Sequence, residues 1–313
     1  MILLIQYTLI FASVLSLVAL GGCFSEHSGV INLGLEGIMV MGALGGALSM
    51  NVIPETMPAV FIVLVVILTS LIFGALYSCL LAIASIHFKA DQTLVGTAMN
   101  MLATAIAAVL VRGFNSAQNA DNVSTILKYV NPKKALIIRF GNFEFNWFML
   151  LALTALIVSY MVLYKTRFGL RLMACGENPQ AADSVGINVY KMRWAGVLIS
   201  GILGGLGGIV YITAGVSEWK FEVGVAGFGF LSLAVMIFGK WKPTNIALAA
   251  LLFGFFRSLS NTYSGIEFMA ALKIPGTVYN MLPYIISLIV LALTSKNSAA
   301  PKAEGIPYDK GTR

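Results

Sequence analysis

Long apolar runs separated by short polar segments are the dominant pattern of this chain. The runs lie near residues 2–22, 36–53, 59–86, 93–111, 146–164, 194–213, 225–239, 244–260 and 278–295. A nearly uncharged run of about 20 apolar residues predicts a helix that crosses a lipid bilayer. The pattern therefore predicts an all-α, polytopic bundle of about eight to ten transmembrane helices, with boundaries good to a few residues.

Three of these runs depart from a simple crossing. The run at 59–86 is longer than one crossing needs, which predicts tilt or a break. The runs at 36–53 and 225–239 are short and rich in glycine. Paired short, glycine-interrupted segments mark substrate sites in some transporters, so broken or re-entrant helices at 34–46 and 224–239 are a hypothesis.

Composition agrees with a membrane protein. Of the 313 residues, 58% are hydrophobic and 11% are charged, whereas a soluble domain carries about 25% charged residues. We expect one transmembrane domain at 1–295 and a tail at 296–313. No Lys or Arg precedes the first run, so a basic signal-peptide start is absent and we expect residues 2–22 to be a retained span.

Lys and Arg gather beside the spans, and their distribution predicts orientation rather than nucleic-acid binding. The richer set of connections holds Lys89, Lys165, Arg167, Arg171, Lys191, Arg193, Lys240, Lys242, Lys296, Lys302, Lys310 and Arg313. The poorer set holds Lys128, Lys133, Lys134, Arg139, Lys220 and Lys273. In a bacterial plasma membrane this places 165–193 and the tail in the cytoplasm, and the polar connection at 113–145 outside.

Known catalytic and metal-binding patterns are missing from the sequence. The three cysteines and two histidines are scattered, so neither a disulfide framework nor a metal site follows. The sequence Gly239-Lys240 is followed by Trp241, so no P-loop is present and the chain does not bind ATP by that motif. We expect no catalytic residues, no bound metal and no cofactor on this chain.

A polar segment at 168–193, FGLRLMACGENPQAADSVGINVYKMR, contains a short helix with clear ends. Asn178 is a good N-cap because its side-chain oxygen accepts from free backbone N–H groups. Pro179 suits the first helical position, and Gly186 suits a left-handed stop. The capping alone fits an ordinary structured loop as well as a helix presented to a partner.

Three polar residues interrupt the apolar regions near the second and fourth runs. Glu36 opens a helix, where exposed N–H groups favour a carboxylate. Asn32 and Asn100 carry amides that need partners inside a bilayer. For each of these residues, an interhelical hydrogen bond and a contact with a transported substrate are both open.

Glycines recur at the four-residue spacing that lets membrane helices approach closely. The pairs are Gly42 with Gly46, Gly201 with Gly205, and Gly204 with Gly208. Such pairs predict tight helix packing, with or without a role in transport.

Four sequence blocks together resemble the membrane-spanning permease of bacterial ABC importers, in the branched-chain amino acid and simple-sugar permease superfamily. They are GGCFSEHSGVINLGLEGIMVMGA at 21–43, DQTLVGTAMNMLA at 91–103, FGLRLMACGENPQAADSVGINV at 168–189, and SGILGGLGGIVY through GFGFLSLAVMIFGKWKP at 200–243. LPY at 282–284 and GIPYDKG at 305–311 add to the likeness. Within the superfamily, nucleoside-type permeases are the most similar branch.

The resemblance implies that 165–193 contains a cytoplasmic coupling helix that docks on a separate ATPase subunit. The residues that match the docking block are Gly176, Glu177, Asn178, Pro179, Ala181, Ala182, Gly186 and Ile187. Gln180 stands where the wider ABC permease motif often has Glu. ATP and Mg²⁺ would bind the ATPase partner and not this chain.

The resemblance also implies a second permease chain, an extracytoplasmic substrate-binding lipoprotein and a nucleoside substrate. We expect the substrate pathway to be lined by Asn32, Glu36, Asn100 and Phe228. Three alternatives remain: a permease for a simple sugar such as ribose or galactose, an ion-coupled secondary transporter, and a structural membrane subunit or channel without a substrate-driven cycle. A secondary transporter should carry titratable residues deep in its spans, and here these are scarce.

Overall fold

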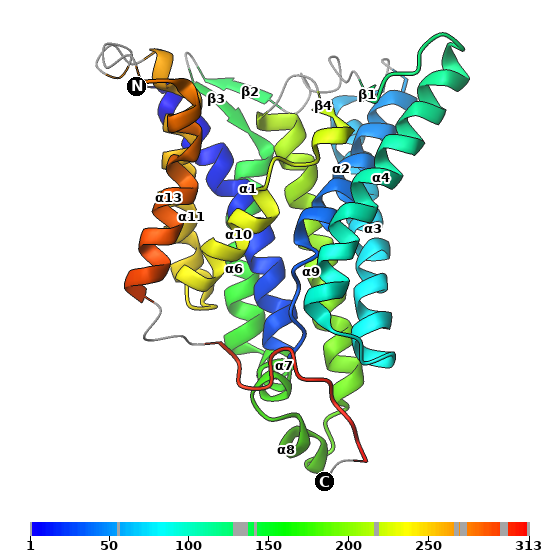
Figure 1. Cartoon of the computed structure of the whole chain (residues 1–313), viewed down its shortest axis with the longest axis vertical. Coiled ribbons are helices and arrows are strands. Elements are labelled where there is room, and N and C mark those ends of the chain that lie inside the picture. The colour runs from blue at the N-terminus through cyan, green and yellow to red at the C-terminus, as the bar shows by residue number, and fades with distance from the viewer. Residues whose placement is uncertain are drawn as a thin grey trace.

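Two long helices, α1 (Ile2–His27) and α9 (Val189–Val210), pack against each other through the middle of the molecule (Figure 1). This computed structural model describes residues 2–54, 57–127, 137–140, 143–215, 219–265, 269, 274–294 and 300–311. Every position is buried from Ile10 to Glu26 in α1 and from Gly204 to Val210 in α9, so these stretches have no exposed face. α1 and α9 therefore form the core of the bundle.

The other helices surround this pair on two flanks. One flank holds α2 (Leu35–Val52), α3 (Ala59–Ala82) and α4 (Gln92–Gln118). The other flank holds α10 (Phe228–Phe238), α11 (Pro243–Thr262) and α13 (Gly276–Thr294), and α6 (Trp147–Lys165) packs on α1. All nine predicted spans thus correspond to a helix within the described residues.

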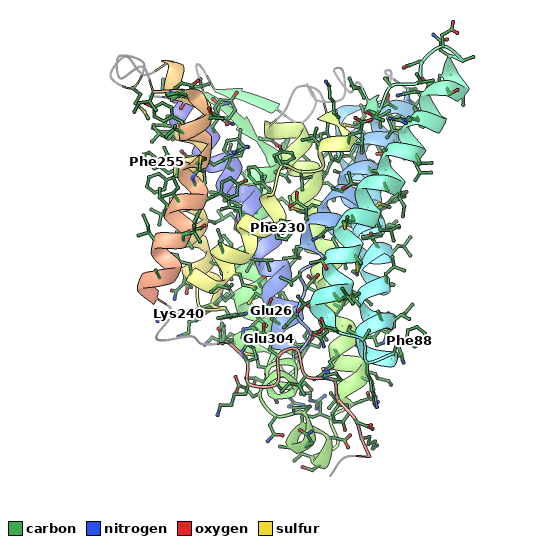
Figure 2. All side chains as sticks on the ribbon, viewed as in Figure 1. Glu26, Phe88, Phe230, Lys240, Phe255 and Glu304 are labelled. Carbon is green, nitrogen blue, oxygen red and sulfur yellow. The ribbon has the colours of Figure 1, made fainter. Side chains whose placement is uncertain are left out.

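Six helices of the described part are long and apolar enough to cross a membrane: α1, α2, α3 with its extension, α4, α6 and α9 with its extension. Large apolar side chains such as Phe88 and Phe255 are exposed at the outer edges of the bundle (Figure 2). An outer surface of this kind suits lipid rather than water. The prediction of a polytopic helical membrane protein is confirmed.

Several helix boundaries differ from the sequence prediction in informative ways. α1 continues beyond residue 22 to His27, because Ser25 and Glu26 are buried and bonded at its end. The long third run continues as a π-helix, η1 (Ile83–His87). α10 has only 11 residues, as its short glycine-rich run predicts, whereas α2 is a continuous helix of 18 residues.

The connection predicted as a polar loop at 113–145 has more structure than expected. α4 continues to Gln118, and β1 (Ile126–Leu127) pairs antiparallel with β4 (Trp219–Lys220). A hairpin of β2 (Ile137–Phe140) and β3 (Phe143–Asn146) follows. Residues 128–136 and 141–142, with Lys128, Lys133 and Lys134, lie outside the described residues.

Short single-turn elements complete this end of the molecule. They are η2 (Tyr211–Gly215), η3 (Phe221–Val223) and η4 (Tyr263–Gly265). The opposite end carries α7 (Arg167–Glu177), α8 (Pro179–Ser184) and the C-terminal residues 300–311 (Figure 1). We call this end the α8 face.

Glycines bring α2, α3 and α9 into backbone contact, as their spacing predicts. A Cβ atom added to Gly42 would overlap the Cα atom of Gly205, and one added to Gly74 would lie 2.8 Å from that same Cα atom. On another side of α9, a Cβ atom on Gly204 would come within 2.8 Å of Ile38 Cγ2. α9 therefore uses glycine on two faces, and van der Waals contact between backbones holds these helices together.

We expect Gly42→Ala to separate α2 from α9 and to lower stability by about 1–3 kcal/mol, the usual range for overpacking. The matched control is Gly113→Ala in α4, where no atom lies within 4 Å of the added Cβ; it should be neutral or stabilise by up to about 1 kcal/mol. Thermal unfolding in detergent measures both variants. Equal midpoints for the two would contradict the packing role of Gly42.

Candidate functional site

The docking block consists of two short helices with a sharp break between them. Asn178 separates α7 from α8 with an extended backbone at φ −151°. Its side-chain oxygen accepts from the N–H of Ala181 at 3.0 Å, and Pro179 occupies the first turn. The predicted N-cap and first-turn proline are confirmed, and both come from rules that act within a few residues.

The end of α8 is a Schellman motif. The N–H of Ile187 donates to the carbonyl of Ala182 at 3.0 Å, and the N–H of Gly186 donates to the carbonyl of Asp183 at 2.9 Å. Gly186 has φ +83°, which confirms the predicted left-handed stop. A Cβ on Gly186 would have no atom within 4 Å, so glycine is needed here for its backbone conformation and not for space.

α8 has one face toward the protein and one toward solvent. Pro179 and Ala182 are buried, and Ala182 packs in a small apolar cluster with Cys175, Val189 and Tyr308. The solvent face consists of Asn178, Gln180, Ala181, Ser184, Val185 and Gly186. The two adjacent alanines of the sequence block therefore differ in position: Ala182 anchors the helix, and Ala181 is available to a partner.

The remaining block residues also divide between the two faces. Gly176 is buried, and its position allows no side chain, because an added Cβ would overlap the carbonyl of His27. Glu177 is exposed and Ile187 is half-buried against the small cluster. Burial raises the pKa of Cys175 to about 11, so its thiol stays protonated and behaves as a small apolar group.

The predicted pathway amides both hydrogen-bond to neighbouring segments. Asn32 is fully buried in the connection from α1 to α2, and its Nδ2 donates to Ser200 Oγ at 2.8 Å. Asn100 on α4 accepts from the N–H of Gly37 at 2.8 Å and donates to the carbonyl of Leu33 at 2.9 Å. These bonds join the connection to α4 and α9, as the interhelical alternative predicted.

Glu36 has a different partner from the one expected. The sequence suggested that the N–H groups at the start of its own helix, α2, would favour its carboxylate. Instead, Oε1 accepts from the N–H of Gly227 at 2.8 Å and Oε2 accepts from the N–H of Gly229 at 2.6 Å. These N–H groups are at the start of α10, so one carboxylate joins the first turns of α2 and α10.

Phe228 follows Gly227 and is buried in an aromatic cluster. Its ring centroid lies 4.7 Å from that of Tyr211 and 5.5 Å from that of Phe11. The guanidinium carbon of Arg257 lies 5.2 Å from the ring centroid. The structure thus brings Phe228 and Glu36 close together, while Asn32 and Asn100 bind the connection that precedes Glu36.

Sequence reasoning missed the position of Arg257 beside Phe228. Its Nε is buried and has no hydrogen-bond partner among the described residues. The sequence did contain a signal for this position, because a cation inside the apolar run at 244–260 should face the bundle interior. Ser200 and Tyr211 were also missed, because an isolated serine or tyrosine in a span carries little information by itself.

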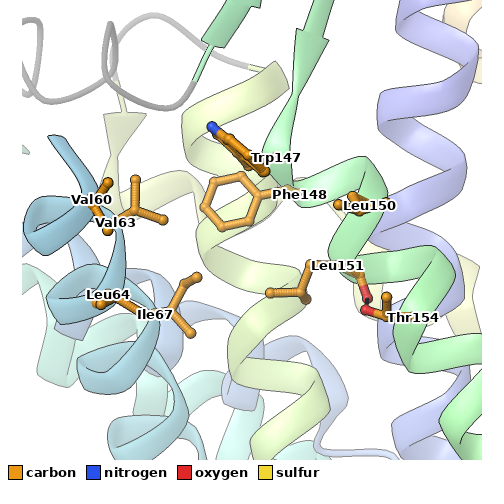
Figure 3. A pocket seen from close by; sticks show the side chains of 9 residues that line it. All are labelled: Val60, Val63, Leu64, Ile67, Trp147, Phe148, Leu150, Leu151 and Thr154. Carbon is orange, nitrogen blue, oxygen red and sulfur yellow. Dashed lines mark hydrogen bonds between the residues drawn. The ribbon is translucent and has the colours of Figure 1, made fainter.

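A groove between α3 and α6 does not suit a polar substrate. Its cavity volume is ≈ 370 Å³, and Figure 3 shows its lining side chains. They are Val60, Val63, Leu64, Ile67, Trp147, Phe148, Leu150, Leu151 and Thr154. A nucleoside or sugar needs several convergent hydrogen-bonding groups, so this surface fits apolar lipid chains. Within the described residues no cluster of three His, Cys, Asp or Glu side chains is placed to hold a metal ion.

Comparison with known proteins gives the family of this bundle. Residues 4–293 match the model for the branched-chain amino acid transport system / permease component. The chain belongs to this family of membrane-spanning permeases.

Two relatives resemble the chain over nearly its whole length. It is 41% identical to the nucleoside ABC transporter permease protein NupC of Lactococcus lactis, covering 98% of this chain and 97% of that protein. It is 40% identical to the guanosine ABC transporter permease protein NupQ of Bacillus subtilis, covering 99% of this chain and 98% of that protein.

A third relative is less similar. The chain is 29% identical to the putative glucose ABC transporter permease protein TsgC13 of Haloferax volcanii, covering 82% of this chain and 76% of that protein.

Asn100→Leu should destabilise the protein, because it leaves the N–H of Gly37 and the carbonyl of Leu33 unpaired at about 1–3 kcal/mol each. Thr97→Val is the matched control on the same helix, since Thr97 is exposed and bonds only within α4. Thermal unfolding and uptake per folded molecule are measured together. If uptake per folded molecule also falls, Asn100 is a pathway residue. If uptake per folded molecule is unchanged, Asn100 serves only the packing of the helices.

Proposed function

We propose that this chain is the translocation subunit of an ATP-driven importer that carries purine or pyrimidine nucleosides. The observation that carries the substrate class is the identity of 40–41% to permeases named for nucleosides and guanosine, over almost the full length of all three chains. Identity at this level, over nearly the full length of the chain, supports the same class of cargo for this chain.

The exposed face of α8 is our proposed docking site for a separate ATPase subunit. Its support is a helix that is capped at both ends, anchored on one side by Pro179 and Ala182, and open on the other. Small side chains such as Ala181 and Ser184 on the open face permit a close fit. A rigid helix transmits displacement, because closure of the ATPase dimer moves it as one body.

The proposed orientation puts the α8 face in the cytoplasm. It rests on the Lys and Arg residues that gather at this end, and on the need for ATP from the cytoplasm. A second permease chain and an extracytoplasmic binding protein complete the proposed importer, with ATP and Mg²⁺ on the ATPase. Hydrolysis takes place on that subunit, and this chain is not an enzyme.

The proposed route for substrate passes near the start of α10. Glu36, the guanidinium of Arg257 and the buried rings of Phe228 and Tyr211 lie together in this part of the bundle. Opening of the bundle during transport would expose these rings for stacking on a nucleobase and the guanidinium for hydrogen bonds to ribose or base oxygens. Asn32 and Asn100 shape this region by holding the connection between α1 and α2.

A simple sugar is the second candidate cargo. It is favoured by the identity of 29% to a putative glucose permease over 82% of the chain. The lower identity and coverage make this candidate weaker than a nucleoside.

Uptake into proteoliposomes that contain the whole importer tests the function. We expect ATP-dependent accumulation of a labelled nucleoside such as guanosine or uridine, and complete loss when the partner ATPase is catalytically inactive. Accumulation of ribose or glucose instead would select the sugar alternative. Uptake that continues with the inactive ATPase and responds to an ion gradient would sink the importer proposal.

Gly186→Val should uncouple transport from ATP hydrolysis, because a β-branched residue at φ +83° is strained by at least about 1–2 kcal/mol and distorts the end of α8. We expect nucleoside uptake per ATP to fall about tenfold, the effect of roughly 1.4 kcal/mol. Gly186→Asn is the matched control, since asparagine tolerates the left-handed region. Equal uptake per ATP in both variants would remove α8 from the coupling pathway.

A further inference from the structure

The C-terminal residues 300–311, which we call the strap, cross the α8 face and bind the ends of several helices (Figure 1). Near its start, the N–H of Ala303 donates to the carbonyl of Gly176 at 2.8 Å, at the end of α7. Two residues later, the N–H of Gly305 donates to the carbonyl of Gly29 at 3.3 Å, just after α1. The first half of the strap therefore joins α7 to α1.

A buried arginine from α9 lies beneath the strap. Arg193 is 1% exposed, and its Nη1 donates to the carbonyl of Ile306 at 2.9 Å. Its Nε and Nη2 have no hydrogen-bond partner among the described residues. The strap thus provides the hydrogen-bond acceptor that this buried cation has among the described residues, and without the strap the guanidinium would lose that acceptor and become accessible to water.

Glu304 fixes the strap to the end of α1. Its carboxyl group is hydrogen-bonded to that of Glu26, which also accepts from the indole N–H of Trp241, and the two glutamates lie close together in Figure 2. Burial raises the pKa of Glu304 to about 7. A proton can therefore be shared between the two carboxyl groups near neutral pH, which allows their contact.

The second half of the strap reaches α8 itself. Tyr308 is buried behind Ala182 in the small cluster, and its ring is 5.4 Å from that of Tyr190 in an edge-on arrangement. Lys310 Nζ lies 3.9 Å from Asp183 Oδ1 on α8. The inner face of α8 is therefore supported by residues of α7, α9 and the strap.

The strap also binds the turn between α3 and α4. Lys89 Nζ donates to Asp309 Oδ2 at 2.6 Å, and both side chains are nearly half exposed. The hydrogen bond raises the pKa of Lys89 and lowers that of Asp309, so the pair is charged over a wide pH range. Asp309 thus lies between α8 and the turn that leads into α4.

We propose that the strap is a second coupling connection, which transmits displacement of α8 to α1, α9 and the α3–α4 turn. Covalently, α8 is joined only to α7 and, through Asn188, to α9. A six-residue helix with those two attachments can rotate against the bundle when pushed. Tyr308 and Glu304 restrict that rotation, because they hold α8 and the end of α1 to one continuous segment.

This inference rests on the proposed function, since α8 must receive force from an ATPase. It assigns Tyr308 a positioning role and not a contact with substrate or nucleotide. It also predicts that the strap is dispensable for docking itself, because the outer face of α8 consists of other residues.

Tyr308→Ala in the complete importer tests the strap. We expect the ATPase to copurify and to hydrolyse ATP as in the wild type, while nucleoside uptake per ATP falls about fivefold or more, the lower end of typical coupling effects. Ile306→Ala is the matched control, because that side chain is 56% exposed and the hydrogen bonds of Ile306 are made by its backbone N–H and carbonyl groups, which the substitution keeps. Wild-type uptake per ATP in Tyr308→Ala, or an equal loss in both variants, would overturn the inference.

The Lys89–Asp309 pair gives a second test that does not depend on core packing. An exposed ion pair contributes little to stability, so neither Lys89→Asp nor Asp309→Lys should unfold the protein. Each should lower uptake per ATP about twofold, within the range measured for exposed pairs, and the double variant should recover it. If neither single variant lowers uptake per ATP, or if the double variant does not restore it, the coupling role of the strap is contradicted.

The controls separate the two proposals. If the inactive ATPase and Gly186→Val both leave uptake intact, the proposed function fails whatever the strap variants do. If both abolish or reduce uptake while Tyr308→Ala and the charge exchanges have no effect, only the strap inference fails.

Discussion

Every backbone N–H and C=O group inside a bilayer must find its partner within the protein, and this constraint explains most of the polar residues in the bundle. The helices satisfy their own groups, but the connection between α1 and α2 and the start of α10 do not. Asn100 bonds the N–H of Gly37 and the carbonyl of Leu33, and Glu36 bonds the N–H groups of Gly227 and Gly229. Side chains from distant segments therefore provide the hydrogen bonds that the backbone lacks where the helices of this permease are interrupted.

The same constraint makes structural and transport roles hard to separate. A residue that completes a backbone break also lies where two half-formed helices meet, which is where transporters bind their cargo. Glu36 shows this overlap, since it joins the first turns of α2 and α10 and lies next to the aromatic cluster of Phe228. A change at Glu36 would therefore alter both the packing of these two helix starts and the chemistry of the proposed substrate route.

Local features of the fold could be predicted from the sequence because their causes are local. The caps of α8 depend on Asn178, Pro179 and Gly186 within nine residues, and the spans depend on apolar runs. The glycine pairs also predicted close packing, since spacing along a helix determines which residues share a face. Their partners, such as Gly205 for Gly42, could not be read from the pattern.

Contacts between residues far apart in the chain could not be predicted from local sequence patterns. Glu26 is bonded to Trp241 across 215 positions, and Lys89 to Asp309 across 220. No periodicity encodes such a pair, and Glu26, Lys89 and Asp309 each resemble an ordinary charge when taken alone. The C-terminal segment was likewise predicted only as a tail, although Ala303 and Tyr308 are buried.

The two-sided character of α8 has a consequence for how importers of this family diverge. Ala182 packs with Cys175, Val189 and Tyr308, so a larger residue at this position would require these neighbours to change as well. Gln180, Ala181 and Ser184 face outward and are under no such restriction from their own chain. In the proposed docking role, the outward side chains could therefore diverge to suit a different ATPase while the internal packing of the permease stays the same.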